Sequence, residues 1–201
     1  MSSSTRRSQD TAPKFEWLWS QMTLVALIVL CIIASLLSDR FLSPININNV
    51  LMQGAVITVI TIGMTYVIIC GGFDLSVGSV VAFSGCVAAQ VMLETNIVFG
   101  VGAGIAIGAG VGWINGVIVT KLRVNPFIAT LGTMVLFRGA TLLFTGGQPV
   151  VGEDGLPQLF VDFAIERLFG VPYLVWFPII LVLVFSWVLH RTAYGVRIFA
   201  T

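Results

Sequence analysis

Long apolar runs separated by short polar breaks dominate the chain. Each run continues for about twenty residues, the length that a helix needs to cross about 30 Å of hydrocarbon. Strands of a membrane barrel would instead show about ten residues of alternating polarity. The pattern therefore predicts an all-α fold, a polytopic bundle of about six transmembrane helices. The expected spans are residues 17–37, 50–69, 75–93, 97–120, 124–144 and 172–189.

The residues before the first apolar run are rich in Ser, Thr and Arg. We expect residues 1–16 to form a short disordered tail in the cytoplasm, and residues 17–201 to form one transmembrane domain. A cleaved signal peptide would have a shorter apolar stretch and then a small-residue cleavage site. The first run has full span length and ends in LLSDRF, so we interpret it as a retained helix.

Composition agrees with a membrane protein. Hydrophobic residues make up 57% of the chain and charged residues 9%, with a mean hydropathy of +1.02, whereas a soluble domain carries about 25% charged residues. The net charge of +1 leaves no basic stripe that could neutralise nucleic-acid phosphates. Cys31, Cys70 and Cys86 lie inside apolar runs without CxxC spacing, so we expect buried thiols and no metal site, cofactor or disulfide.

Basic residues predict the orientation of the bundle, because Lys and Arg in short loops stay on the cytoplasmic side. We place the N-terminus in the cytoplasm, so that the longest polar connection, residues 146–170, faces outward. Arg40 and Arg167 then lie outside. The basic residues inside are Arg6, Arg7, Lys14, Lys121, Arg123, Arg191 and Arg197.

The most informative polar break is GGFDLSVGS, residues 71–79. Asp74 interrupts a chain without Asp, Glu, Lys or Arg over residues 41–73 and 75–93, so it lies at or near a bilayer boundary. Ionisable groups in such positions are costly and usually functional. Asp74 and Ser76 are therefore candidates for a solute pathway, and a turn between two helices is the structural alternative.

Glycines recur at every fourth residue along the span 97–120. In lipid, small residues let two helix backbones approach closely, so we interpret this stripe as one helix-packing face, with a face that slides during transport as the alternative. Asn115, near the inner end, is a candidate for the pathway or for a bond to a neighbouring helix. The glycines of the stripe are Gly100, Gly104, Gly108, Gly112 and Gly116.

Pro126 predicts a helix start, because proline lacks a backbone donor and disfavours helical geometry at Asn125. Asn125 is either the N-cap of that helix or a polar contact to a solute or partner. Arg138 lies about 18 Å further along the helix and therefore within the membrane. It must snorkel, pair or face water there. We expect a structural pairing, with a hydrated pathway as the alternative.

Several long motifs in the same order resemble the membrane permeases of bacterial sugar ABC importers of the ribose, xylose and galactose type. The resemblance covers about residues 41–201. Its motifs are GGFDLSVGS (71–79), NGVIV (115–119), RVNPFIATLG (123–132), RG (138–139) and TGGQP (145–149).

The resemblance implies a permease subunit that forms a monosaccharide pathway through the bacterial inner membrane. The implied partners are a second permease subunit, commonly a copy of the same chain, a cytoplasmic ABC ATPase and a periplasmic sugar-binding protein. The permease itself would not be an enzyme, and the sequence contains no GxxxxGK[ST] phosphate loop. The pathway or family-motif candidates are Asp74, Ser76, Asn115, Asn125 and Arg138.

Permeases of this family are longer than this chain. The final segment TAYGVRIFA, residues 192–200, resembles the lead-in to a cytoplasmic segment that contacts the ATPase. We therefore expect a C-terminally truncated permease, and an inactive remnant is one alternative function. Another is an ion-coupled secondary transporter in which Asp74 relays a proton or sodium ion. A membrane enzyme is disfavoured, because the single His190 supplies no cluster of catalytic groups.

Overall fold

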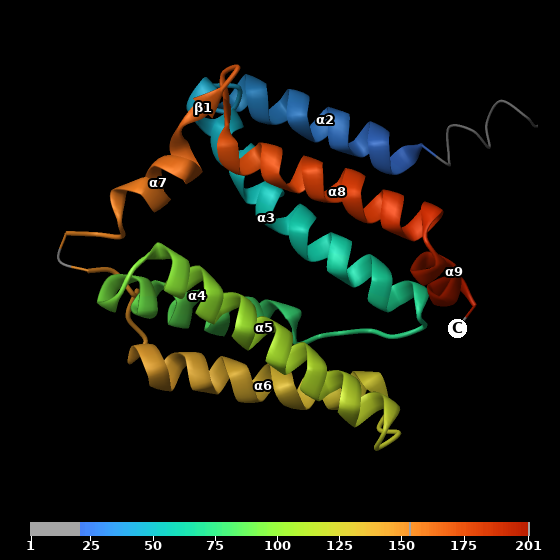
Figure 1. The fold of residues 1–201 in the computed structure, drawn as a ribbon. Helices are drawn as coiled ribbons and strands as arrows, with labels where there is room; N and C mark the ends of the chain where they lie inside the picture. The colour runs from blue at the N-terminus through green and yellow to red at the C-terminus, as the bar shows by residue number, and fades with distance from the viewer. Residues whose placement is uncertain (1–20, 153, 201) are drawn as a thin grey trace, which may run out of the picture. The chain divides into compact units, whose positions relative to one another are not determined.

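The computed structural model describes residues 21–152 and 154–200 and consists mainly of helices (Figure 1). The N-terminal tail predicted for residues 1–16 lies outside the described residues. The chain divides into two compact units, residues 1–49 and 50–201. The elements in chain order are α2 (Met22–Leu37), α3 (Pro44–Ile69), α4 (Val77–Glu94), α5 (Ile97–Thr120), α6 (Pro126–Thr145), α7 (Gln158–Ile165), β1 (Arg167–Leu168), β2 (Val171–Pro172), α8 (Tyr173–Arg191) and α9 (Ala193–Phe199).

The predicted all-α polytopic fold is confirmed. Five described helices, α3, α4, α5, α6 and α8, are long and apolar enough to cross a membrane. The apolar helix α2 is shorter, and residues 17–20 of its predicted span lie outside the described residues. The helix ends follow local capping: α3 begins at Pro44 instead of Val50, because Ser43 Oγ accepts a hydrogen bond from the Asn46 amide at 3.3 Å.

In the second unit, α4, α5 and α6 pack side by side (Figure 1). The tightest approach is at Gly100 of α5, where an added Cβ would stand 2.6 Å from Met92 Cβ and 2.7 Å from the Ala88 carbonyl oxygen. The Phe83 ring of α4 contacts the Phe137 ring of α6, with 5.4 Å between ring centroids. Small residues thus bring α4 against α5, and aromatic rings fill the wider space between α4 and α6.

A polar contact joins α3 to α8. The Tyr66 hydroxyl donates a hydrogen bond to the Phe185 carbonyl at 2.7 Å, and the two rings meet edge to face with centroids 5.7 Å apart. The short helix α9 then folds back on α8 at Gly195, where a Cβ would collide with the Leu189 carbonyl. Only glycine fits this close contact, which holds α9 against the end of α8.

The connection 146–170 contains structure that its polarity did not predict. Its second half forms α7 and β1, and β1 pairs antiparallel with β2, which directly follows the connection, with Arg167 opposite Pro172 and Leu168 opposite Val171. Phe169 (φ 55°) and Gly170 (φ 82°) form the turn, and two consecutive positive φ angles are typical of a two-residue hairpin.

The burial expected for the cysteines is wrong, because none of the three is buried. Cys31 and Cys70 are exposed and Cys86 is half-buried. Most large apolar side chains of the helices are likewise exposed, among them Leu143 at 88%. An apolar run in a bundle of this size has one face on its neighbours and another on the surrounding hydrocarbon or on further helices. Position within an apolar run therefore does not imply burial within the protein.

Candidate functional site

The connection between α3 and α4 holds Asp74 in a local turn. Asp74 Oδ1 accepts two hydrogen bonds from Ser76, one from the backbone amide at 2.8 Å and one from the hydroxyl at 2.6 Å. Ser76 is fully buried and stands immediately before the first residue of α4. This side-chain turn explains why α4 begins at Val77 and not at the predicted Leu75.

Asn115 of α5 extends this network into the bundle. Its Nδ2 donates to Ser76 Oγ at 2.9 Å, and the side chain is 5% exposed. Because the Ser76 hydroxyl gives its single proton to the Asp74 carboxylate, its oxygen can only accept from Asn115. That direction fixes the amide with Nδ2 toward Ser76. Asn115 Oδ1 is left buried and has no hydrogen-bond partner among the described residues.

Asp74 and Asn115 border a cavity of about 560 Å³, and Ser76 is hydrogen-bonded to both of them. Asp74 and Asn115 line it, and so do Gly112, Gly116 and Thr130. Thr130 is 3% exposed, and its hydroxyl donates to the Pro126 carbonyl at 2.8 Å. The remaining wall consists of Tyr66, Val67, Cys70, Gly71, Gly72, Phe73, Val119, Thr120, Pro126, Tyr194 and Ile198.

The five glycines of the stripe lie on two different surfaces of α5. Gly100 and Gly104 lie against α4, whereas a Cβ at Gly108, Gly112 or Gly116 would have no neighbour within 4 Å. A four-residue step exceeds one helical turn by 0.4 residue, so successive glycines rotate by about 40° around the axis. Over the length of α5 the stripe therefore turns from α4 toward the cavity. A packing role for the last three glycines stays a prediction.

Asn125 lies immediately before α6 and Arg138 lies within it, and neither lines this cavity. Asn125 Oδ1 accepts a hydrogen bond from the Phe127 amide at 2.9 Å, which is the capping geometry expected from its position before Pro126. Arg138 is exposed, and no carboxylate within residues 21–152 or 154–200 forms a salt bridge with it. The pathway roles of both residues stay predictions, as does the pairing of Arg138.

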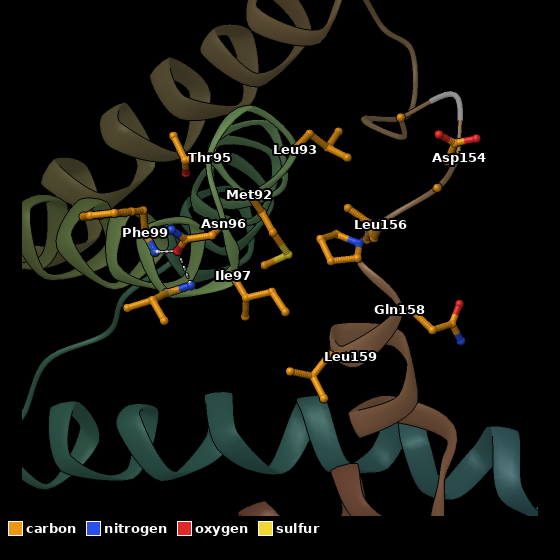
Figure 2. A pocket seen from close by; sticks show the side chains of 14 residues that line it. Met92, Leu93, Thr95, Asn96, Ile97, Phe99, Asp154, Leu156, Gln158 and Leu159 are labelled. Carbon is orange, nitrogen blue, oxygen red and sulfur yellow. Dashed lines mark hydrogen bonds between the residues drawn. The ribbon is translucent and has the colours of Figure 1, made fainter.

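A second cavity, of about 1040 Å³, lies at the opposite end of the α4 and α5 pair. Figure 2 shows Met92, Ile97 and Leu159 turned toward the same space between the α4–α5 turn and the loop before α7. Asn96 is not free to bind a ligand there with Oδ1, which accepts from the Val98 and Phe99 amides at 3.0 and 3.1 Å. Since α4 rises about 27 Å over its length, the two cavities are separated by roughly a membrane thickness.

Sequence reasoning missed Thr130, Tyr66 and Tyr194 as parts of the first cavity. Thr130 lies one turn into α6, three residues before Thr133, and polar residues within a span are a usable signal. Tyr66 and Tyr194 come from α3 and α9, so only the folded chain brings them to one cavity. No group of three or more potential metal ligands occurs within the described residues.

A family model and several curated permease proteins match most of this chain. The model of the family described as "Branched-chain amino acid transport system / permease component" matches residues 46–201. The ribose import permease protein of Escherichia coli K12 is 45% identical over 186 residues, which is 92% of this chain. That of Bacillus subtilis 168 is 41% identical over 88% of the chain, and the L-arabinose ABC transporter permease protein of Azospirillum brasilense is 34% identical over 86%.

The chain spans about half the length of these curated relatives: the aligned region covers 58%, 55% and 50% of them, in the same order. No solved structure matches the chain.

Proposed function

This chain belongs to the family of transport-system permease components matched over residues 46–201, and we propose that it is the transmembrane permease subunit of an ATP-driven importer for a monosaccharide. It forms part of the translocation pathway, and a separate ABC ATPase in the cytoplasm hydrolyses ATP. A second permease subunit, in the simplest case another copy of this chain, completes the pathway. A periplasmic sugar-binding protein delivers the solute. The site of action is the bacterial inner membrane, with the N-terminus in the cytoplasm.

One observation carries this proposal: 45% identity over 92% of the chain to a protein named as a ribose import permease. The other relatives cited above carry the names of ribose and L-arabinose permeases. The family description names branched-chain amino acids instead, whose carboxylate calls for a cation or an array of donors. No Lys or Arg is among the described residues that line the cavity at Asp74 and Asn115, which favours an uncharged solute.

The proposed orientation assigns each of the two cavities to one side of the membrane. With the N-terminus inside, the α3–α4 connection, the end of α5 and helix α9 all lie on the cytoplasmic side. The cavity lined by Asp74 and Asn115 is then the inner one, and the cavity at Met92 and Leu159 is the outer one. A pathway for solute needs openings on both sides, and these two cavities are its proposed ends.

An uptake assay tests the proposal. The chain is expressed in an Escherichia coli strain that lacks its ribose import permease protein but keeps the partner subunits, and uptake of labelled D-ribose is measured. We expect uptake that stops when ATP is depleted and persists briefly after the ion gradient is collapsed.

Two results would overturn the proposal. Uptake that survives ATP depletion but stops with the ion gradient would identify a secondary transporter. Absence of uptake, with the chain present in the membrane at a normal level, would reject an importer role for the chain as given and would favour the inactive remnant. The matched control is the vector without the chain, which sets the background of ribose entry.

A further inference from the structure

We infer that the inner cavity, defined by Asp74, Gly112, Asn115, Gly116 and Thr130, is a binding site for an uncharged, hydroxyl-rich solute, and that Asn115 Oδ1 is its hydrogen-bond acceptor. Asp74 is a positioning residue, which acts through Ser76 to hold the amide in the accepting orientation. The inference rests on the proposed function and names a site within the pathway.

The Asn115 side chain has a buried oxygen atom, Oδ1, without a hydrogen-bond partner among the described residues. Asn115 is 5% exposed and lines the cavity, and its Oδ1 has no partner in the described part of the chain. A buried carbonyl without a hydrogen bond costs about 1–3 kcal/mol, so a native structure rarely keeps one without a partner from outside the chain. A donor from a bound solute would satisfy it.

The hydrogen bonds that link Asn115, Ser76 and Asp74 all point toward the Asp74 carboxylate. Asp74 accepts from Ser76 Oγ at 2.6 Å, and Ser76 Oγ accepts from Asn115 Nδ2 at 2.9 Å. Rotating the amide by half a turn would place two acceptors, Oδ1 and the Ser76 oxygen, against each other without a proton between them. The amide is therefore held in one orientation, and Oδ1 is available only as an acceptor.

The cavity is open beside Asn115, because the residue one turn before it and the residue directly after it on α5 are glycines. Gly112 and Gly116 precede and follow it on α5, and a Cβ at either position would have no atom within 4 Å. Both glycines are exposed to the cavity, which they line. A solute can thus approach the α5 backbone on both sides of the amide, which any larger side chain at these two positions would prevent.

The wall of the inner cavity favours one class of solute. Its polar groups are mainly acceptors: the second carboxylate oxygen of Asp74 makes no hydrogen bond within the described residues, and Thr130 Oγ1 already donates to the Pro126 carbonyl. The Tyr66 hydroxyl likewise donates its hydrogen bond to the Phe185 carbonyl. A wall of acceptors with aromatic and apolar surface between them suits a small solute that carries many hydroxyl donors, and the Asp74 carboxylate repels anions.

The native Cys70 provides a test that needs no transport activity, because it is exposed and lines this cavity. In the full chain carrying Cys31→Ser and Cys86→Ala, the rate at which N-ethylmaleimide labels Cys70 is measured in detergent with D-ribose, with sucrose as the osmotic control and with potassium chloride. We expect D-ribose alone to slow labelling several-fold.

Matched alanine variants of α5 locate the effect. Gly112→Ala and Gly116→Ala should each raise the ribose concentration needed for protection by roughly tenfold, the usual effect of one misplaced methyl group in a binding pocket. Gly108→Ala introduces the same change on the same helix, also without a neighbour within 4 Å, but it does not line the cavity, so protection should stay as in the parent. Thermal unfolding of each variant identifies any loss of fold.

Three results would overturn the inference: no protection by ribose, equal protection by potassium chloride, or equal effects of the Gly108 and Gly112 substitutions. If the chain imports ribose but Cys70 is not protected, the cavity assignment alone fails. If import and protection are both absent, the proposed function fails as well. Protection without import would keep the site and reject the importer role.

Discussion

Asp74 acts in this structure mainly through a single oxygen atom. Asp74 Oδ1 accepts from both the amide and the hydroxyl of Ser76, so it closes the turn before α4 and sets the donor direction that reaches Asn115. An isosteric amide would keep an acceptor oxygen at the same place, whereas alanine would remove it. The acceptor and the charge of this residue can therefore be separated experimentally.

We expect Asp74→Ala to lower the free energy of unfolding by about 2 kcal/mol, because it leaves two donors of Ser76 without an acceptor in a buried site. Asp74→Asn should cost less than half of that, since its amide oxygen can accept both bonds. Unfolding in mixed detergent micelles with increasing dodecyl sulfate measures both variants. Equal losses would mean that the negative charge, and not the acceptor, stabilises the turn.

At the scale of the element, α5 has two functions along one glycine stripe. Its first half packs against α4 through Gly100 and Gly104, and its last half faces the inner cavity through Gly112 and Gly116. The sequence pattern alone predicted a single face, because a four-residue repeat stays close to the helical period of 3.6 residues over one or two turns but departs from it over the roughly four turns of the stripe.

Alanine substitutions on this helix should therefore change the free energy of unfolding in opposite directions, lowering it at Gly100 and raising it at Gly108. Gly100→Ala places a methyl group 2.6 Å from Met92 Cβ and 2.7 Å from a backbone oxygen, so we expect a loss of about 1–3 kcal/mol in unfolding free energy. Gly108→Ala meets no neighbour within 4 Å, and alanine is the better helix former by about 0.5–1 kcal/mol. The same detergent titration applies, and a destabilised Gly108→Ala variant would contradict this assignment of surfaces.

The helix boundaries show what sequence can and cannot predict at this scale. Pro126 and Asn125 marked the start of α6 correctly, because a cap and a first-turn proline act within a few residues. The start of α3 was misplaced, since Ser43 and Pro44 extend the helix into polar sequence that hydropathy counts as a break. The small hairpin after α7 was missed, because two-residue strands leave no periodic signal.

For the whole molecule, hydropathy predicted the class and the approximate spans, and the order of motifs predicted the family, which the family match confirms. The members of the inner cavity were only partly predictable. Asp74, Ser76 and Asn115 stood out as polar groups in apolar surroundings, but their direct connection depends on packing between α4 and α5. Tyr194 reaches the same cavity because α9 packs closely on α8 at Gly195, a contact that no local pattern indicates.

The proposed topology has its own test. In a chain without its native cysteines, Phe169→Cys lies in the turn of the hairpin, where Phe169 is 89% exposed, and Lys121→Cys lies in the exposed α5–α6 connection. A membrane-impermeant maleimide should label the Phe169→Cys protein in intact spheroplasts, and the Lys121→Cys protein only after permeabilisation. Reversed accessibility would invert the topology and exchange the inner and outer assignments of the two cavities.

The hydrogen-bond chain from Asp74 through Ser76 to Asn115 also has a genetic consequence. Because each member determines what the next can donate or accept, the effects of substitutions at these positions should not add, and a second change in the chain should cost little once the first has broken it. Randomising all three codons together and selecting for uptake should therefore recover substitutions as compatible combinations and seldom as independent single changes. The three positions would then vary as one inherited unit, although Asn115 is 39 positions from Ser76 along the chain.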